Sequence, residues 1–127
     1  MKRVLVVDDE IGALTLIGIM LERGGFEVLK AQHAREALHL LDMEGAPDIF
    51  ILDVMMPEID GIQLCRMLRE REETKDVPVL ILSARSDAKS VIQGMEAGAT
   101  DYILKPIFHH NLVEKVRNLL NMGATAD

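Results

Sequence analysis

The chain has one cysteine, no long apolar run and little positive charge, and each shortage excludes a class of protein. With Cys65 alone no internal disulfide can form, so we expect a reducing compartment, the cytoplasm. No apolar segment approaches the roughly 20 residues that span a bilayer, and the first residues, MKRVLVVDDE, meet acid too early for a signal peptide. The formal net charge of -7 disfavours a nucleic-acid backbone or an anionic membrane as the main partner.

What is present fits one folded domain. The 127 residues are 49% hydrophobic and 28% charged, values that argue against disorder and for a soluble globular protein with a core of its own. We expect one domain over residues 1–122 and a short tail at 123–127. No composition shift indicates a second domain.

Strand-like and helix-like patterns alternate along the chain. Apolar runs predict strands at 3–7, 26–31, 49–52, 77–82 and 102–104. Apolar residues at helical spacing predict helices at 12–22 and 34–43, after Gly61, from an N-cap at Ser86 or Asp87 to 94–98, and around 112–120. Five strand–helix repeats need right-handed crossovers, so the sequence predicts an α/β fold with a (βα)5 doubly wound, five-stranded parallel sheet.

Three packing expectations can be tested directly. On the first helix the inward stripe is predicted to be Ala13, Leu16, Ile17, Met20 and Leu21, which leaves Leu14, Gly18 and Ile19 facing outward. Cys65 and most of the eight methionines are expected to fill the core. The charged run from Arg69 to Asp76, REREETKD, is expected to be a solvated helix end and loop.

Polar residues follow four of the predicted strands. Asp8 and Asp9 follow the first strand, Asp53 the third, Ser83 the fourth and Lys105 the fifth. Parallel strands end at one edge of a sheet, where open α/β sheets bind their ligands. We therefore expect these five residues to meet in one shallow cleft. Singly, each residue has a plainer explanation as a helix cap, a turn residue or a surface lysine, but their coincidence at strand ends favours a site.

This constellation indicates magnesium-dependent phosphoryl chemistry. Clustered carboxylates repel one another and recruit a cation, and Mg²⁺ prefers oxygen ligands, with waters and a phosphate completing its shell. Asp53 can act as the nucleophile that forms an acyl phosphate. Lys105 and Ser83 can hold phosphate oxygens by an ion pair and a hydrogen bond. The four histidines, His33, His39, His109 and His110, lack metal-ligand spacing and are expected at the surface.

Four motifs, VLVVDDE, ILDVMMPEIDG, LILSAR and GATDYILKP, occur in the order and spacing of a response-regulator receiver domain, which the chain closely resembles from about Lys2 to Met122. The resemblance implies a flavodoxin-like sheet with strand order 2-1-3-4-5. It implies that Asp53 is the phosphoacceptor, and that the metal ligands are Asp8, Asp9, Asp53 and the backbone carbonyl of Met55. It further implies a cis peptide bond before Pro106.

The same resemblance implies a switch and a set of partners. Ser83 and Tyr102 are expected to move after phosphorylation and to change the surface of the fourth helix, fifth strand and fifth helix. The phosphoryl donor is a histidine kinase, a phosphotransfer protein or a small molecule such as acetyl phosphate. A downstream output domain or protein reads the switch, and a phosphorylation-dependent homodimer is a further expectation. No direct binding to nucleic acid or membrane is expected.

Some positions depart from the family pattern, and other functions compete. Met55 and Arg85 offer no group to orient an attacking water, which predicts a phosphoryl group stable well beyond seconds. Ile107 and Phe108 depart from the usual KPF and leave the start of the fifth helix open. A flavin binder would need a first loop without the acids Asp8 and Asp9. A magnesium phosphohydrolase would need a cap, and a degenerate receiver that only binds proteins would not need every reactive position filled.

Overall fold

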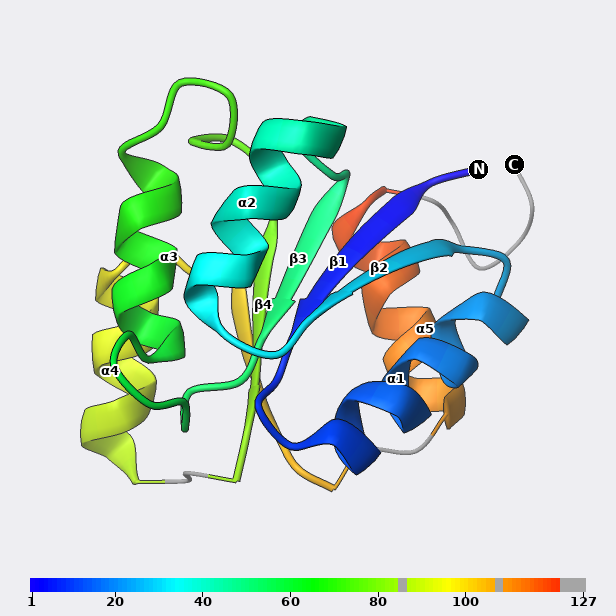
Figure 1. The fold of residues 1–127 in the computed structure, drawn as a ribbon. Helices are drawn as coiled ribbons and strands as arrows, with labels where there is room; N and C mark the ends of the chain where they lie inside the picture. Colours follow the sequence, from blue (N-terminus) through cyan, green and yellow to red (C-terminus); the bar gives the residue numbers. More distant parts are fainter. Residues whose placement is uncertain (85–86, 107–108, 122–127) are drawn as a thin grey trace.

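The computed structural model describes residues 1–84, 87–106 and 109–121, in which five strands and five helices alternate. They are β1 (Arg3–Val7), α1 (Ile11–Arg23), β2 (Glu27–Ala31), α2 (Ala34–Glu44), β3 (Ile49–Leu52), α3 (Gly61–Arg69), β4 (Val79–Ser83), α4 (Ala88–Glu96), β5 (Asp101–Leu104) and α5 (His109–Leu119). Figure 1 shows the sheet in the middle, with helices on both sides of it. The predicted series of five strand–helix repeats is confirmed.

All strand pairs are parallel, and the sheet has the order β2-β1-β3-β4-β5. The doubly wound, flavodoxin-like fold with strand order 2-1-3-4-5 is therefore confirmed. Val7, the last residue of β1, pairs with Leu52, the last residue of β3. Because these two strands end level with each other, the residues that follow them leave the sheet side by side.

Alternate residues of each central strand enter two separate hydrophobic clusters. One cluster joins Leu5, Phe50 and Ile81 to α2 and α3. The other joins Val6, Ile51 and Leu80 to α1 and α5. β3 contributes to both, and its four residues are all at most 1% exposed, which is why its sequence shows no polar alternation. Of the apolar residues at helical spacing in the later helices, most are buried (Ala37, Leu41, Leu64, Cys65, Leu68, Leu112 and Val116), whereas Leu38, Leu119 and Leu120 are half-buried.

The predicted orientation of α1 is wrong by about one residue. Its buried residues are Leu14, Ile17, Gly18 and Leu21, whereas Leu16 is 53% exposed. Nearly every position from Ile11 to Leu21 is apolar or small, so the spacing fits two stripes equally well. Gly18 is buried because the aliphatic stem of Lys30 lies over it, 3.2 Å from where a Cβ atom would be. Of the three residues predicted to face outward, only Ile19, at 42%, is exposed.

The charged run after α3 is not simply solvated. Thr74 is fully buried, and its hydroxyl donates to the carbonyl of Leu68 at 2.5 Å. The Arg69 guanidinium donates to the carbonyls of Thr74, Lys75 and Val77 through Nη1, at 2.6 to 3.2 Å, and to that of Gly98 through Nε at 2.9 Å. Charge alone predicted that the run is exposed to solvent, but these contacts order the run between α3 and β4 and tie it to Gly98, just after α4.

The methionine prediction is wrong for Met1, Met43, Met55 and Met95, which are between 43% and 91% exposed. Met56 is 8% exposed and lies in the core, and Met20 and Met67 are half-buried, with Met20 packed against the core. Of the histidines, His33, His39 and His110 are exposed as predicted. His33 also has a structural role, because its Nδ1 accepts the backbone N–H of Glu36 and caps α2.

Several expectations fall outside the part of the chain that the structure describes. They concern Arg85 beside the site, Ser86 as a helix cap, Ile107 and Phe108 before α5, and the tail at 123–127. The other cap candidate, Asp87, does cap α4 by accepting the Ser90 N–H at 3.0 Å. Within residues 1–84, 87–106 and 109–121, no helix combines the length and apolar character that crossing a membrane requires.

Candidate functional site

The ends of β1 and β3 place two carboxylates next to each other. The Asp8 N–H donates to the carbonyl of Ala31 at 3.1 Å, and the Asp53 N–H donates to that of Val7 at 2.9 Å. Each aspartate is thus held by the neighbouring strand although its own strand has just ended. Asp8 is 1% exposed and Asp53 is 7% exposed. The sheet therefore fixes both backbones and buries both side chains.

Asp9 completes a cluster of three carboxylates. One ligand oxygen from each of Asp8, Asp9 and Asp53 lies within 4.8 Å of the other two, and Asp9 is exposed where the others are buried. A set of oxygen donors at this spacing suits Mg²⁺, which is held in proteins by one or two carboxylates together with waters. The predicted convergence of the three aspartates is observed in the geometry.

Lys105 approaches the cluster from the end of β5. Its N–H donates to the carbonyl of Ser83 at 2.8 Å, which ties it to β4. Its Nζ lies 3.0 Å from Oδ2 of Asp8 and 3.6 Å from Oδ1 of Asp53. The peptide bond between Lys105 and Pro106 is cis, as the resemblance implied. Among the described residues that line the cleft, Lys105 is the one cationic side chain.

The electrostatics of the site act most strongly on Asp53. Its pKa is raised from 3.8 to about 6, chiefly by burial and also by the charges of Asp8 and Asp9, although Lys105 and a hydrogen bond from the Met55 backbone act to lower it. Burial alone would lower the pKa of Lys105, but its hydrogen bonds and charge interactions with Asp8 and Asp53 outweigh burial and raise that pKa. The cluster thus holds more negative charge than its one lysine balances, which favours a cation.

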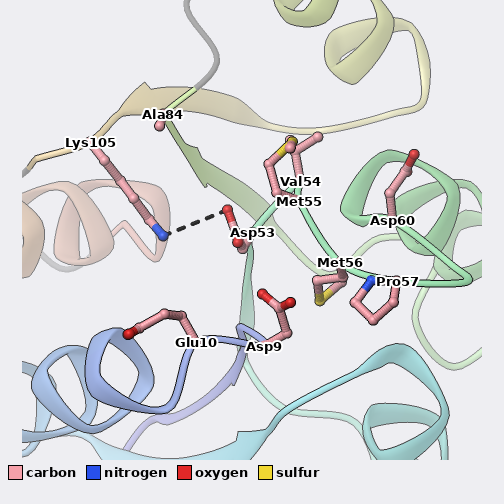
Figure 2. A pocket seen from close by; sticks show the side chains of 10 residues that line it. All are labelled: Asp9, Glu10, Asp53, Val54, Met55, Met56, Pro57, Asp60, Ala84 and Lys105. Carbon is pink, nitrogen blue, oxygen red and sulfur yellow. Dashed lines mark ion pairs between the residues drawn. The ribbon is translucent and has the colours of Figure 1, made fainter.

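The cluster opens into a cleft of about 650 Å³. Figure 2 shows Lys105 and Asp53 facing each other across it, with Asp9 and Glu10 on one wall and the segment after β3 on another. Met55, from that segment, also lines the cleft, and 55% of it is exposed. The cleft is wide enough and polar enough to admit a phosphoryl group from solvent.

The two predicted switch residues lie behind the cleft. Ser83 is the last residue of β4 and is fully buried, next in the sheet to Leu104. Tyr102 on β5 is half-buried and packs against the cluster that includes Ala97 and Ala99. A Cβ atom on Gly94 would lie 3.0 Å from the Tyr102 ring, so α4 lies directly against it. Gly94 therefore belongs to the packing of α4 on β5.

The capping explanation for Asp8 and Asp9 is wrong. Glu10 is the N-cap of α1, since its Oε1 accepts the Ala13 N–H at 2.6 Å. Asp8 instead accepts the Glu10 N–H through Oδ1 at 3.0 Å, which fixes the orientation of its carboxylate. Because Glu10 caps the helix, neither aspartate is needed for capping, and both side chains can take part in the carboxylate cluster.

Gly61 is a residue of the site that the sequence does not single out. It was expected only to precede the third helix, yet it is the first residue of α3 and lies directly against the backbone of Asp53. Its position after Asp60, a good N-cap, was the available signal, but the contact with Asp53 depends on how the loop folds back and leaves no periodic pattern in the sequence.

Comparison with known proteins agrees with this geometry. A profile described as the response regulator receiver domain matches residues 4–117. The chain belongs to the response regulator receiver family. It is 37% identical over 126 residues to the phosphate regulon transcriptional regulatory protein PhoB of Pseudomonas aeruginosa, covering 99% of this chain and 55% of that protein. It is 38% identical over 125 residues to the alkaline phosphatase synthesis transcriptional regulatory protein PhoP of Bacillus subtilis, covering 98% and 51% respectively.

Solved receiver structures superpose closely on this one. A putative response regulator from Chloroflexus aurantiacus has a TM-score of 0.89 at 38% identity, over 94% of this chain and 98% of that chain. The BeF3-activated DrrB receiver domain has a TM-score of 0.85 at 32% identity, over 95% and 98%. This receiver spans about half the length of the curated relatives it matches. These matches confirm the two-component receiver function and do not favour a flavin binder or a phosphohydrolase.

Proposed function

We propose that this receiver takes up one phosphoryl group on Asp53. The observation that carries the proposal is the position of Asp53 itself, buried at a strand end within 4.8 Å of two further carboxylates and 3.6 Å from the Lys105 ammonium. Such an arrangement has little use as a structural ion pair, because three carboxylates share one lysine. It suits a site whose charge is completed by a cation and an incoming phosphoryl group.

In the proposed reaction an ionised carboxylate oxygen of Asp53 attacks phosphorus. With a phosphohistidine donor, the new P–O bond forms as the P–N bond breaks, and the electron pair of that bond leaves with the imidazole. Lys105 balances charge on the phosphoryl oxygens from one side of the cleft. Asp8 holds Lys105 in place through the ion pair at 3.0 Å.

We infer that Mg²⁺ is the cofactor, held by Asp8, Asp9, Asp53 and the backbone carbonyl of Met55. The donors are all oxygen, as Mg²⁺ prefers, and Asp9 is exposed, so a hydrated ion can enter the cleft. When bound, the ion neutralises negative charge that would otherwise repel the phosphoryl donor. Asp8 already accepts from Glu10 through Oδ1 and from Lys105 through Oδ2, so it would have to share these oxygens with the ion.

The proposed switch runs from Asp53 through Ser83 to Tyr102. A phosphoryl group adds roughly -1.5 to -2 charge and strong acceptor oxygens. The carbonyl of Ser83 accepts the N–H of Lys105 at 2.8 Å, and Tyr102 packs against Gly94 of α4. Movement of the two side chains would change the surface of α4, β5 and α5, where output partners bind.

The proposed partners follow from the family and from the exposed surface. A histidine kinase or phosphotransfer protein would supply the phosphoryl group in the cytoplasm. The matched relatives are named as transcriptional regulators and are about twice as long, so we propose an output domain or protein downstream. A homodimer would form on phosphorylation. Kinase docking is proposed on the exposed apolar residues of α1, which are Ile11, Leu16 and Ile19.

A mass measurement tests the proposal. The purified chain is incubated with Mg²⁺ and acetyl phosphate, and the intact mass is recorded before and after. We expect one added phosphoryl mass, which Asp53→Asn abolishes and EDTA prevents. Asp60→Asn is the matched control, because Asp60 lines the same cleft outside the carboxylate cluster, and this variant should still be phosphorylated on Asp53. No adduct on the wild-type chain would leave the protein-binding module as the function.

A further inference from the structure

The first residue of α3 leaves no room for a side chain against the backbone of Asp53. A Cβ atom on Gly61 would lie 2.2 Å from the Asp53 carbonyl oxygen, 2.8 Å from its carbonyl carbon and 3.1 Å from Cα of Val54. All three are backbone atoms of the segment that carries the phosphoacceptor, and they cannot rotate aside. At Gly18, by contrast, the nearest atom belongs to the flexible Lys30 side chain at 3.2 Å.

This close approach is held in place by hydrogen bonds. The carbonyl of Val54 accepts the N–H of Gly61 at 3.1 Å and that of Met56 at 3.0 Å, so the loop after β3 is closed onto the start of α3. The start of α3 is fixed in turn by a capping box. Asp60 accepts the Gln63 N–H at 2.8 Å, and Gln63 accepts the Asp60 N–H at 2.9 Å.

Asp53 is therefore held between two elements. On one side its N–H donates to the carbonyl of Val7 in β1 at 2.9 Å, and on the other side Gly61 packs against its carbonyl group. We propose that Gly61 is a positioning residue for phosphoryl transfer. Its missing side chain sets where the Asp53 carboxylate and the following Met55 carbonyl lie relative to Asp8. This inference rests on the proposed role of Asp53 as phosphoacceptor.

The size of the effect follows from geometry. To bring a Cβ–O distance from 2.2 Å to an ordinary contact, the start of α3 and residues 53–54 must separate by about 1 Å. Catalytic groups need to be held within about 0.5 Å, and a misplacement of about 1 Å lowers rates by roughly 100-fold. Since Val7 still holds the N–H of Asp53, the shift would fall mainly on the carbonyl side, toward Met55.

The main experiment compares Gly61→Ala with Gly18→Ala in the full chain. Both replace a buried helical glycine by alanine, but only the first meets backbone of the site. We expect the maximal rate of phosphorylation, at saturating Mg²⁺ and acetyl phosphate, to fall by roughly 100-fold in Gly61→Ala and to stay within twofold in Gly18→Ala. In the absence of Mg²⁺ and donor, amide chemical shifts in Gly61→Ala should change at residues 53–56. A substitution that lowers the rate without moving the backbone of the site would not change them.

A second pair of variants keeps the test decisive if Gly61→Ala does not fold. Gln63→Ala removes half of the capping box without adding atoms, and Gln63→Glu restores an acceptor at the same position. We expect roughly a threefold loss of rate in Gln63→Ala and recovery in Gln63→Glu, since the cap holds Gly61 against Asp53.

The outcomes separate this inference from the proposed function. A folded Gly61→Ala variant that is phosphorylated within threefold of the wild-type rate would overturn the positioning role and leave the phosphoacceptor intact. If Gly61→Ala is unfolded, a Gln63→Ala rate equal to wild type would do the same. Absence of any adduct on the wild-type chain would instead refute the phosphoacceptor role, and the positioning role with it.

Discussion

The ammonium of Lys105 is 3.0 Å from a carboxylate oxygen of Asp8, closer than to any oxygen of Asp53. The shorter ion pair of the lysine is therefore with Asp8, the more deeply buried of the two aspartates. Since an ammonium has three donors, it can keep that ion pair and still turn one N–H toward a new anion in the cleft. The pair with Asp8 positions the lysine, and its remaining donors are available to a phosphoryl group.

Replacing this lysine should separate catalysis from folding. In Lys105→Met the phosphorylation rate with acetyl phosphate and Mg²⁺ should fall by roughly 100-fold, because the cation that stabilises the transferring phosphoryl group is lost. The pKa of Asp53 should rise above about 6, since Lys105 lowers it in the wild type. Lys115→Met is the control, as Lys115 pairs with Asp101 outside the cleft. A rate within threefold of wild type would contradict the role of Lys105.

Asp53→Asn should stabilise the protein in a pH-dependent way. The folded-state pKa of Asp53 is raised from 3.8 to about 6, so its ionised form disfavours folding. The free-energy cost of folding with an ionised Asp53 is absent below about pH 4, grows as the pH rises from about 4 to about 6, and is constant above about pH 6. In urea unfolding with EDTA we expect the variant to gain about 2 to 3 kcal/mol at pH 8 and nothing near pH 3.5.

The control for this measurement is Asp60→Asn, because Asn and Asp serve equally as N-caps. Its free energy of unfolding should stay within about 0.5 kcal/mol of wild type at pH 8. A gain for Asp53→Asn that is equal at pH 3.5 and pH 8 would show that the carboxylate charge is not its cause.

The lifetime of the phosphoryl group remains a prediction that centres on Met55. Its side chain lines the cleft and is 55% exposed, yet it has no group that orients an attacking water. Loss of the added phosphoryl mass after donor removal should therefore take well beyond seconds. Met55→Asn should shorten the lifetime by roughly 10-fold, because an amide both donates to and accepts from water. Met43→Asn, at an exposed position of α2, should leave the lifetime unchanged, and rapid loss of the phosphoryl group from the wild type would refute the prediction.

Arg69 and Arg71 should differ sharply in their effect on stability. Arg69→Ala leaves four backbone carbonyls without their charged donor and should lower the free energy of unfolding by about 2 to 3 kcal/mol. Arg71 pairs with Asp42 and Glu73 near the surface, so Arg71→Ala should lower it by less than about 1 kcal/mol. Equal losses in the two variants, measured by urea unfolding, would contradict the proposed difference.

The sequence predicted the parallel sheet and the clustering of the aspartates for the same physical reason, whereas the strand order was implied by the family resemblance. Apolar runs such as Ile49–Leu52 mark buried strands, and parallel strands end at one edge, so Asp8 and Asp53 follow from the pattern alone. Their roles remain proposals, but their convergence was predictable. The orientation of α1 was not, because apolar residues such as Leu16 surround that helix and two stripes compete.

Contacts between segments far apart in the sequence could not be predicted from the sequence either. Arg69 and Thr74 are polar residues in a charged run, and only the packing of α3 near α4 places carbonyls around the guanidinium. Gly61 likewise has no periodicity that predicts its contact with Asp53. In both cases the decisive partner is a backbone atom, whose position is set by the tertiary fold and not by residue type.

The ion pair between Asp8 and Lys105 joins residues 97 positions apart. Contacts of such long sequence separation form late in folding, after the large loop between them has closed. Until β5 joins the edge of the sheet, the buried carboxylates face one another without the lysine. We therefore expect the last strand to complete the fold and the site together, so that a partly folded or truncated chain does not react with a phosphoryl donor.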